Sequence, residues 1–409
     1  MRMIERARFS DRNLFPTSAS PVIARPSPAS FRHIEYALYV AIFYSYTSAA
    51  LGINVPYLAT ILIMGLTAFC ILRRRSSLWM IHRAVFRPIM CILSFLAIQY
   101  FIFSASFSDL IPFFVWAALI ILIQSAFIRP GFLHRFSFVM FIVGITLMPF
   151  MNLHQGEGSE RVGLSISSVL ANPNALAVWF GFCGIYFLIR ALQTSRLQDK
   201  LISGGLSLVS LIIVGLTVSR SVLVGVALST VLCFRYQLKR GFIPILIAVA
   251  LACGAFAFGF FDNTIGNYVN RGTEEEGRTG VIPYAFQRFL DHPLAGVGVG
   301  NIGTVVPGHE NGTAPHNAFL FFALSSGILP IFLFLAYLAA GFKGALRSTF
   351  NHPYSGYLMP LFAYCAIALL FNDTVYMFPW FNAVLSACLI KPNPRLGHTW
   401  KPVINRLQR

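Results

Sequence analysis

Long apolar runs separated by short basic segments make up most of this chain. About twelve of these runs approach the roughly 20 residues that a helix needs to cross the hydrocarbon core of a bilayer. Their centres lie near Tyr44, Ile63, Leu96, Leu119, Val143, Phe182, Leu208, Ala227, Val249, Phe332, Tyr364 and Val384. The pattern predicts an all-α integral membrane protein with about twelve transmembrane helices.

The composition supports this prediction. The 409 residues are 56% hydrophobic and 11% charged, whereas soluble domains carry about 25% charged residues. A soluble multi-domain protein is therefore excluded, and the expected surroundings are the lipid bilayer. A net charge of +17 would suggest a nucleic-acid partner if the basic residues shared one folded face. They lie instead in short runs between apolar segments, so we expect no nucleic acid.

The distribution of lysine and arginine predicts the orientation. With the N-terminus inside, all basic residues fall on the cytoplasmic side except Arg161, Arg220, Arg271, Arg278 and Arg288. Both termini are then cytoplasmic, as the excess of Lys and Arg in cytoplasmic loops requires. Two polar segments, 152–170 and 261–317, lie on the outer side.

The domain organisation follows from these segments. Residues 1–31, which are basic and rich in Pro and Ser, are predicted to be a disordered cytoplasmic tail. Residues 32–391 form a polytopic membrane domain that includes one large periplasmic loop, 262–315, with short helices. Residues 392–409 form a second basic cytoplasmic tail.

Arg220 stands out among the outer arginines, because it lies between two apolar runs with almost no loop. An arginine at this depth costs a few kcal/mol unless it snorkels to the interface, pairs or faces water. One interpretation is a snorkelling interfacial arginine. The other is an anion clamp, in which Ser219 caps the following helix and leaves its first amides free to face the same anion.

Two further helix starts are predicted on the outer side. Asn172-Pro173-Asn174 precedes one apolar run, with Pro173 suited to the first helical position, and His316-Asn317 precedes another. Simple capping would explain the asparagines. The positive ends of three helix dipoles would also suit a phosphorylated or diphosphorylated substrate.

His316 is the best candidate for a general base, because imidazole accepts a proton near neutral pH. A capping or packing histidine is the alternative. His309 and His292 are weaker candidates that fit ordinary loop residues. Arg278 follows the acidic run 274–276, and is either a salt-bridged loop residue or a second anion contact.

No motif for a nucleotide or a metal is present. The alternation Gly296, Gly298, Gly300 lacks the dinucleotide-binding spacing, and it predicts a tight turn with close backbone approach. The acidic run 274–276 fits a solvated face better than a cation site. We therefore expect neither a metal nor a cofactor.

Together these motifs resemble the O-antigen ligase and O-antigen polymerase superfamily. The resemblance covers about 172–334 and includes 172–177, Ser219-Arg220, Gly277-Arg278, 291–298, His316-Asn317 and 326–329. The chain departs from the family pattern at three places. Ile282 stands where a tryptophan is frequent, Ser325 and Ser326 where a glutamate is, and Pro330 where a glycine is.

The resemblance implies a metal-independent membrane glycosyltransferase of the C type. Its donor would be a glycan on undecaprenyl diphosphate, and its acceptor a sugar of lipid A–core or another lipid-linked repeat. It would face the periplasm from the bacterial inner membrane. His316, Arg220 and Arg278 would be catalytic, and the expected substrate contacts are Asn172, Asn174, Ser219, Asn317 and His309. Exopolysaccharide polymerisation is a third version, and a transporter or flippase for a lipid-linked sugar is the alternative class.

Overall fold

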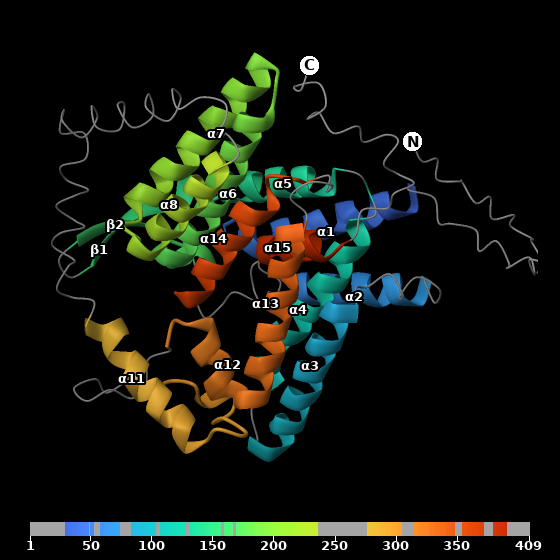
Figure 1. Ribbon diagram of the computed structural model, residues 1–409, viewed down its shortest axis with the longest axis vertical. Coiled ribbons are helices and arrows are strands. Elements are labelled where there is room, and N and C mark those ends of the chain that lie inside the picture. Colours follow the sequence, from blue (N-terminus) through green and yellow to red (C-terminus); the bar gives the residue numbers. More distant parts are fainter. Residues whose placement is uncertain are drawn as a thin grey trace, which may run out of the picture.

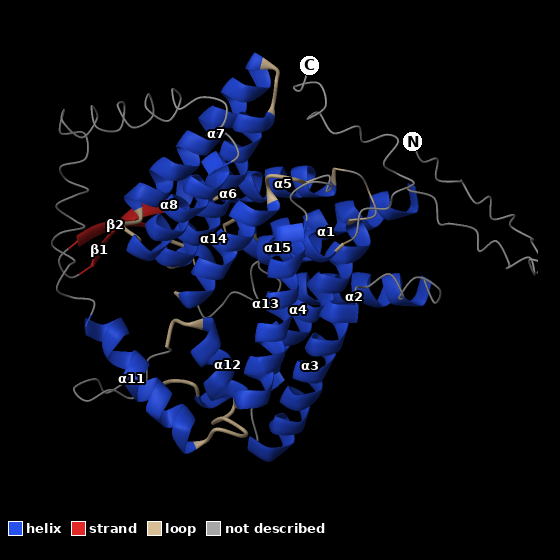
Figure 2. Ribbon diagram, in the orientation of Figure 1, coloured by secondary structure: helices blue, strands red, loops and turns tan. Residues whose placement is uncertain are grey.

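α-Helices dominate the computed structural model of this protein (Figure 2). The structure describes residues 29–48, 50–52, 58–73, 83–103, 107–127, 129, 131–156, 159–166, 169–235, 276–304, 315–347, 354–371 and 379–390. The predicted cytoplasmic tail 392–409 and all but the last residues of the tail 1–31 lie outside this part.

The elements follow one another along the chain as drawn in Figure 1. The first five helices are α1 Ala29–Thr47, α2 Leu58–Arg73, α3 Arg83–Phe103, α4 Phe107–Ala126 and α5 Phe132–Thr146. Next come η2 Met148–Phe150, β1 Met151–Gly156, β2 Ser159–Leu164, η3 Val169–Ala171, α6 Pro173–Gln193, α7 Leu197–Leu216 and α8 Arg220–Arg235. The last are α11 Glu276–Asp291, η5 Val299–Asn301, α12 Ala318–Ser326, α13 Ile328–Arg347, α14 Leu358–Leu370 and α15 Pro379–Leu389.

The predicted apolar runs form helices wherever the structure describes them. Every predicted centre falls in a helix except Val249, which lies outside the described residues. Among the residues that the structure describes, four helical segments are long and apolar enough to cross a membrane: Phe132–Phe150, Pro173–Gln193, Leu197–Leu216 and Ile328–Arg347. The structure is thus consistent with an all-α membrane protein. The twelve spans and the orientation stay predictions.

Helix α6 lies at the centre of the bundle. Its residues are buried around almost the whole circumference, as in a helix that packs against neighbours on all sides. It contacts α5, α7, α8 and α14. Phe182 of α6 stacks on Trp380 of α15, with ring centroids 5.0 Å apart. The position of α6 in turn fixes where its N-terminus, at Pro173, lies.

One element departs from the predicted all-α class. Strands β1 and β2 form an antiparallel hairpin that lies almost wholly within the predicted outer segment 152–170, with Met151 opposite Leu164 and His154 opposite Arg161. Leu164 is buried, and Val162 packs against the main core. Alternate residues of β2 thus face the core, as the two-residue period of a strand allows. A six-residue strand is too short to stand out in a sequence dominated by apolar helices.

The helix predicted to run from His316 through Phe332 is two helices. Helix α12 ends at Ser326, and α13 begins at Ile328 after Gly327, whose φ is +80°. A Cβ on Gly327 would lie 2.3 Å from the carbonyl oxygen of Leu294. The close approach of the 294 backbone therefore requires glycine here and interrupts the helix.

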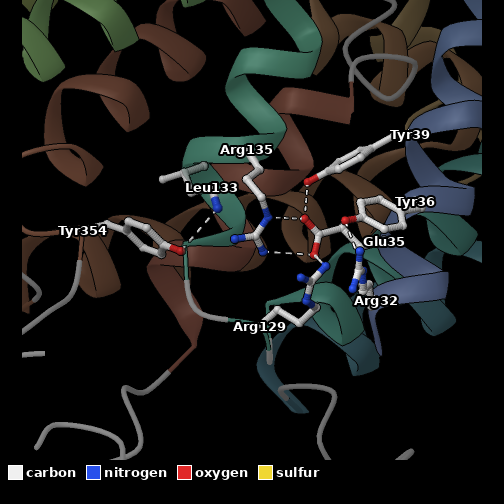
Figure 3. Close-up of polar contacts among 8 residues, drawn as sticks. All are labelled: Arg32, Glu35, Tyr36, Tyr39, Arg129, Leu133, Arg135 and Tyr354. Carbon is white, nitrogen blue, oxygen red and sulfur yellow. Dashed lines mark hydrogen bonds and ion pairs between the residues drawn. The ribbon is translucent and has the colours of Figure 1, made fainter. Parts of the chain in front are cut away.

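A buried ion-pair cluster joins three parts of the fold at the predicted cytoplasmic side (Figure 3). Glu35 of α1 is fully buried, and both its oxygens accept hydrogen bonds from Arg135 of α5, at 2.7 and 3.0 Å. Arg129, just before α5, also pairs with Glu35, and the Tyr39 hydroxyl donates to it. A buried carboxylate needs such partners, because an isolated buried charge is very unfavourable.

The Glu35 cluster predicts a large stability difference between two variants of one residue. Glu35→Ala leaves two partly exposed arginines without their shared carboxylate, and should lower the free energy of unfolding by about 1–3 kcal/mol. Glu35→Gln keeps an acceptor and should lose less. Denaturant unfolding in detergent micelles measures both. Equal midpoints for the wild type and Glu35→Ala would contradict the stabilising role of the cluster.

Candidate active site

The start of helix α6 is held by its own cap and by the hairpin. The exposed Asn172 is the N-cap, and its Oδ1 accepts a hydrogen bond from the backbone N–H of Asn174 at 2.9 Å. Pro173 occupies the first helical position, as predicted. The buried Asn174 side chain accepts a hydrogen bond from Nη2 of Arg161 at 2.8 Å. The predicted helix start is therefore tied to strand β2.

The same arginine reaches the turn that precedes Arg220. Nε of Arg161 donates to the carbonyl oxygen of Thr217 at 2.9 Å, and Thr217 is the C-cap of α7. The next residue, Val218, has a φ of +51°. A left-handed conformation is a genuine outlier for a β-branched residue, and such strain costs about 1–3 kcal/mol. The turn into α8 is thus strained, and a hydrogen bond from strand β2 holds it.

Ser219 occupies the position expected of the α8 N-cap. Helix α8 begins at Arg220, and the Ser219 carbonyl oxygen accepts the first intrahelical bond from the N–H of Leu223 at 3.2 Å. The Ser219 hydroxyl is buried and lies 3.5 Å from that of Ser221. Arg220 is half-buried. The amides at the start of α8 therefore lie beside the strained Val218.

The start of helix α12 follows a second strained residue. Asn317 is the N-cap, and its Oδ1 accepts hydrogen bonds from the N–H groups of Phe319 and Leu320, at 2.9 and 3.1 Å. The preceding residue, the half-buried His316, has a φ of +45°. Capping by Asn317 accounts for the helix start, but it does not account for the unfavourable backbone of His316.

The carboxyl end of α14 brings the starts of α8 and α12 together. Nδ2 of Asn317 donates to the carbonyl oxygen of Leu370 at 3.1 Å. On the other side, Ser221 of α8 and Phe371, directly after α14, line one small, mostly apolar cavity. In Figure 1 the end of α14 lies between α8 and α12. Since Arg161 joins α6 to the α7–α8 turn, the three predicted helix starts belong to one region of the fold.

The glycine-rich segment packs on the break between α12 and α13. The N–H of Val297 donates to the carbonyl of Leu324 at 2.7 Å, and the N–H of Ile328 donates to that of Pro293 at 2.8 Å. Gly296 has a φ of +68°, and a Cβ there would lie 2.4 Å from the Leu324 oxygen. The predicted tight turn with close backbone approach is confirmed. It ties the end of α11 to the helix that starts after His316.

Several predicted site residues belong to the predicted outer segment that contains α11. Arg278 lies in the first turn of α11, but its side chain is outside the described part, as are His309 and Arg271. Arg288, one of the arginines predicted on the outer side, lies in the last turn of α11, and its Nη1 donates to the Gly303 carbonyl. Among the described residues, no three His, Cys, Asp or Glu side chains form a metal-binding group. A metal-independent site remains a prediction.

The segment that contains Arg220, Arg278 and His316 matches a known family. Residues 205–335 match the family model described as O-antigen ligase. This match covers about a third of the chain and supports an assignment to the O-antigen ligase and polymerase superfamily. No curated protein matches the chain.

The O-antigen ligase segment accounts for only part of the site. The family suggests a membrane glycan ligase or polymerase with a glycosyltransferase-type activity on lipid-linked glycans. Asn172, Asn174 and Arg161 precede the matched residues, and the end of α14 follows them. Arg161 is the residue that motif reasoning missed. The sequence did contain one signal for it, because Arg161 is one of the few arginines that do not fall on the predicted cytoplasmic side.

Replacement of Gly296 tests the contact between the glycine-rich segment and the α12–α13 break. Gly296→Ala should release this segment, because its Cβ would overlap the Leu324 oxygen and its φ would become strained. We expect faster amide exchange over 293–298 and weaker activity. The free energy of unfolding should fall by about 1–3 kcal/mol. Hydrogen-exchange and denaturant-unfolding experiments measure the exchange and the free energy.

Gly204→Ala in α7 is the matched control. A Cβ at Gly204 meets nothing within 4 Å, and alanine should stabilise this helix by up to about 1 kcal/mol. Identical exchange over 293–298 in the two variants would show that the Gly296 contact does not hold the segment.

Proposed function

We propose that this protein is an inverting, metal-independent glycosyltransferase of the bacterial inner membrane. It moves a glycan from undecaprenyl diphosphate to an acceptor hydroxyl at the periplasmic face. One observation carries the proposal: within the described residues, the non-glycine residues with positive φ are Val218 and His316. One directly precedes the Ser219-Arg220 pair and the other is the predicted base. Residues with strain of this kind cluster at active sites and at ligand-binding segments.

Arg220 provides the first positive charge that stabilises the leaving diphosphate of the donor. When the bond between the anomeric carbon and the diphosphate oxygen breaks, the diphosphate leaves with the electron pair, and negative charge builds on it. The Arg220 guanidinium and the first amides of α8 stabilise this charge, because both are positive and fixed before the reaction. Arg278, in the first turn of α11, supplies a second cation from the outer segment.

His316 acts on the acceptor. The acceptor oxygen attacks the anomeric carbon from the face opposite the diphosphate, which inverts the configuration, and its proton passes to the His316 imidazole. A new glycosidic bond forms as the old one breaks. His316, with its left-handed backbone, directly precedes the Asn317 cap of α12.

The remaining predicted contacts divide into two groups. Asn172, Ser219 and His309 are proposed to contact the sugar or the diphosphate. Asn174 and Asn317 contribute by holding helix starts, through their contacts to Arg161 and to the Leu370 carbonyl. The acceptor is a sugar of lipid A–core in a ligase, or the growing end of another lipid-linked repeat in a polymerase.

Removal of either central side chain should abolish most of the transfer. We expect His316→Ala to lower the rate by about 10²–10⁴-fold, the usual contribution of a general base. Arg220→Ala should lower it by about 10²–10³-fold, as loss of a charge-stabilising group does. Purified protein in liposomes, given a lipid-linked glycan and either lipid A–core or a second lipid-linked repeat, measures new glycosidic bonds and separates ligase from polymerase.

His292→Ala and Arg196→Ala are the matched controls. His292 is an exposed residue after α11, and Arg196 is exposed at the opposite end of α7 from Arg220. Both controls should keep the wild-type rate. Full transfer by His316→Ala or Arg220→Ala would refute the assigned roles. Movement of the lipid-linked sugar across the bilayer by the wild type, without a new glycosidic bond, would support the transporter alternative and refute the proposed reaction.

A further inference from the structure

Arg161 connects two helix ends that are far apart in the sequence. It lies on β2, and one guanidinium group donates to both the Thr217 carbonyl and the Asn174 side chain. These acceptors belong to the C-cap of α7 and to the first turn of α6. A planar guanidinium suits this arrangement, because its donors have fixed directions and reach two acceptors at once. The compact ammonium of a lysine lacks this fork.

The α7–α8 turn needs such support. Thr217 and Val218 are buried, and a buried carbonyl oxygen at a helix end costs about 1–3 kcal/mol if it has no partner. Val218 adds the cost of its left-handed backbone. The positive charge of Arg161 also complements the negative end of the α7 dipole. One side chain therefore stabilises both the carbonyl and the turn that follows it.

Strand β2, which carries Arg161, is itself held against the helix bundle. Its neighbour Val162 packs against the main core, and Leu164 on the same strand is buried. The hairpin register also pairs Arg161 with His154. The outer hairpin is thus anchored to the bundle and presents Arg161 to the helix ends. This arrangement gives an outer arginine a reason to be present in a chain whose basic residues otherwise gather on the opposite side.

We propose that Arg161 is a positioning residue for Arg220. It holds the strained α7–α8 turn in the conformation that sets Arg220 at the start of α8. The proposal rests on the proposed function, because Arg220 is the group that stabilises the leaving diphosphate. Arg161 acts through the Thr217 carbonyl and not through contact with the substrate.

Loss of Arg161 should affect the reaction more than donor binding. Arg161→Ala frees the turn, and a displacement of about 1 Å of a catalytic group can cost about 10²-fold in rate. We expect kcat to fall on the order of 10- to 100-fold, with a smaller change in KM for the lipid-linked donor. Arg161→Lys keeps the charge and one hydrogen bond, so its kcat should lie between those of the wild type and Arg161→Ala.

The decisive measurement combines Arg161→Ala with Arg220→Ala. If Arg161 acts only through Arg220, the double variant transfers glycan no more slowly than Arg220→Ala alone. Losses that multiply would overturn the proposal, since they would mean that Arg161 acts on the substrate or on the whole fold. The Arg161→Lys comparison preserves this test if Arg161→Ala does not fold.

Hydrogen exchange gives a readout that does not depend on activity. Amides over 217–223 should exchange faster in Arg161→Ala and Arg161→Lys than in the wild type, while those of α13 stay unchanged. Arg196→Ala, at the other end of α7, should leave 217–223 unchanged. Unaltered exchange in both Arg161 variants would overturn the positioning role. If the wild type forms no glycosidic bond, the proposed function fails instead, and the exchange data still decide whether Arg161 holds the turn.

Discussion

The carbonyl groups that end helices α7 and α12 are buried among apolar side chains, so each must accept a hydrogen bond from another part of the chain. Arg161 supplies the donor for Thr217, and the N–H of Val297 supplies it for Leu324. Asn317 does the same for the Leu370 carbonyl of α14. Each contact joins elements distant in sequence. Satisfying these helix ends therefore assembles the region that contains the candidate site.

The same region contains backbone conformations that the chain would otherwise avoid. Val218 and His316 are left-handed without being glycine, and each stands directly before a helix start with capped or supported ends. A rigid surrounding structure is what allows such strain to persist. At the predicted cytoplasmic side, the buried Glu35 and its arginines tie α1 to α5. The buried carboxylate cluster and the strained helix starts thus belong to different regions of the fold.

The helical part of the fold was predictable because spanning helices leave a strong signal of length and hydrophobicity. The start of α6 at Pro173 and the close approach of Gly296 were also predictable, since capping and turn chemistry are local. The hairpin and the break at Gly327 were not. The hairpin depends on the burial of Leu164 in the core. The helix break depends on the Leu294 carbonyl, which is distant in sequence from Gly327. Neither partner can be read from the residues nearby.

By itself, the sequence predicted a helical membrane protein in which Arg220 is an exception among the basic residues and His316 is the best candidate base. Local rules of hydrophobicity, charge and capping suffice for that. Only the tertiary structure decided that the starts of α6, α8 and α12 belong to one region, that the end of α14 contacts α8 and α12, and that Arg161 links α6 to the α7–α8 turn. Such contacts depend on how helices pack around α6, and packing joins residues that no sequence spacing relates.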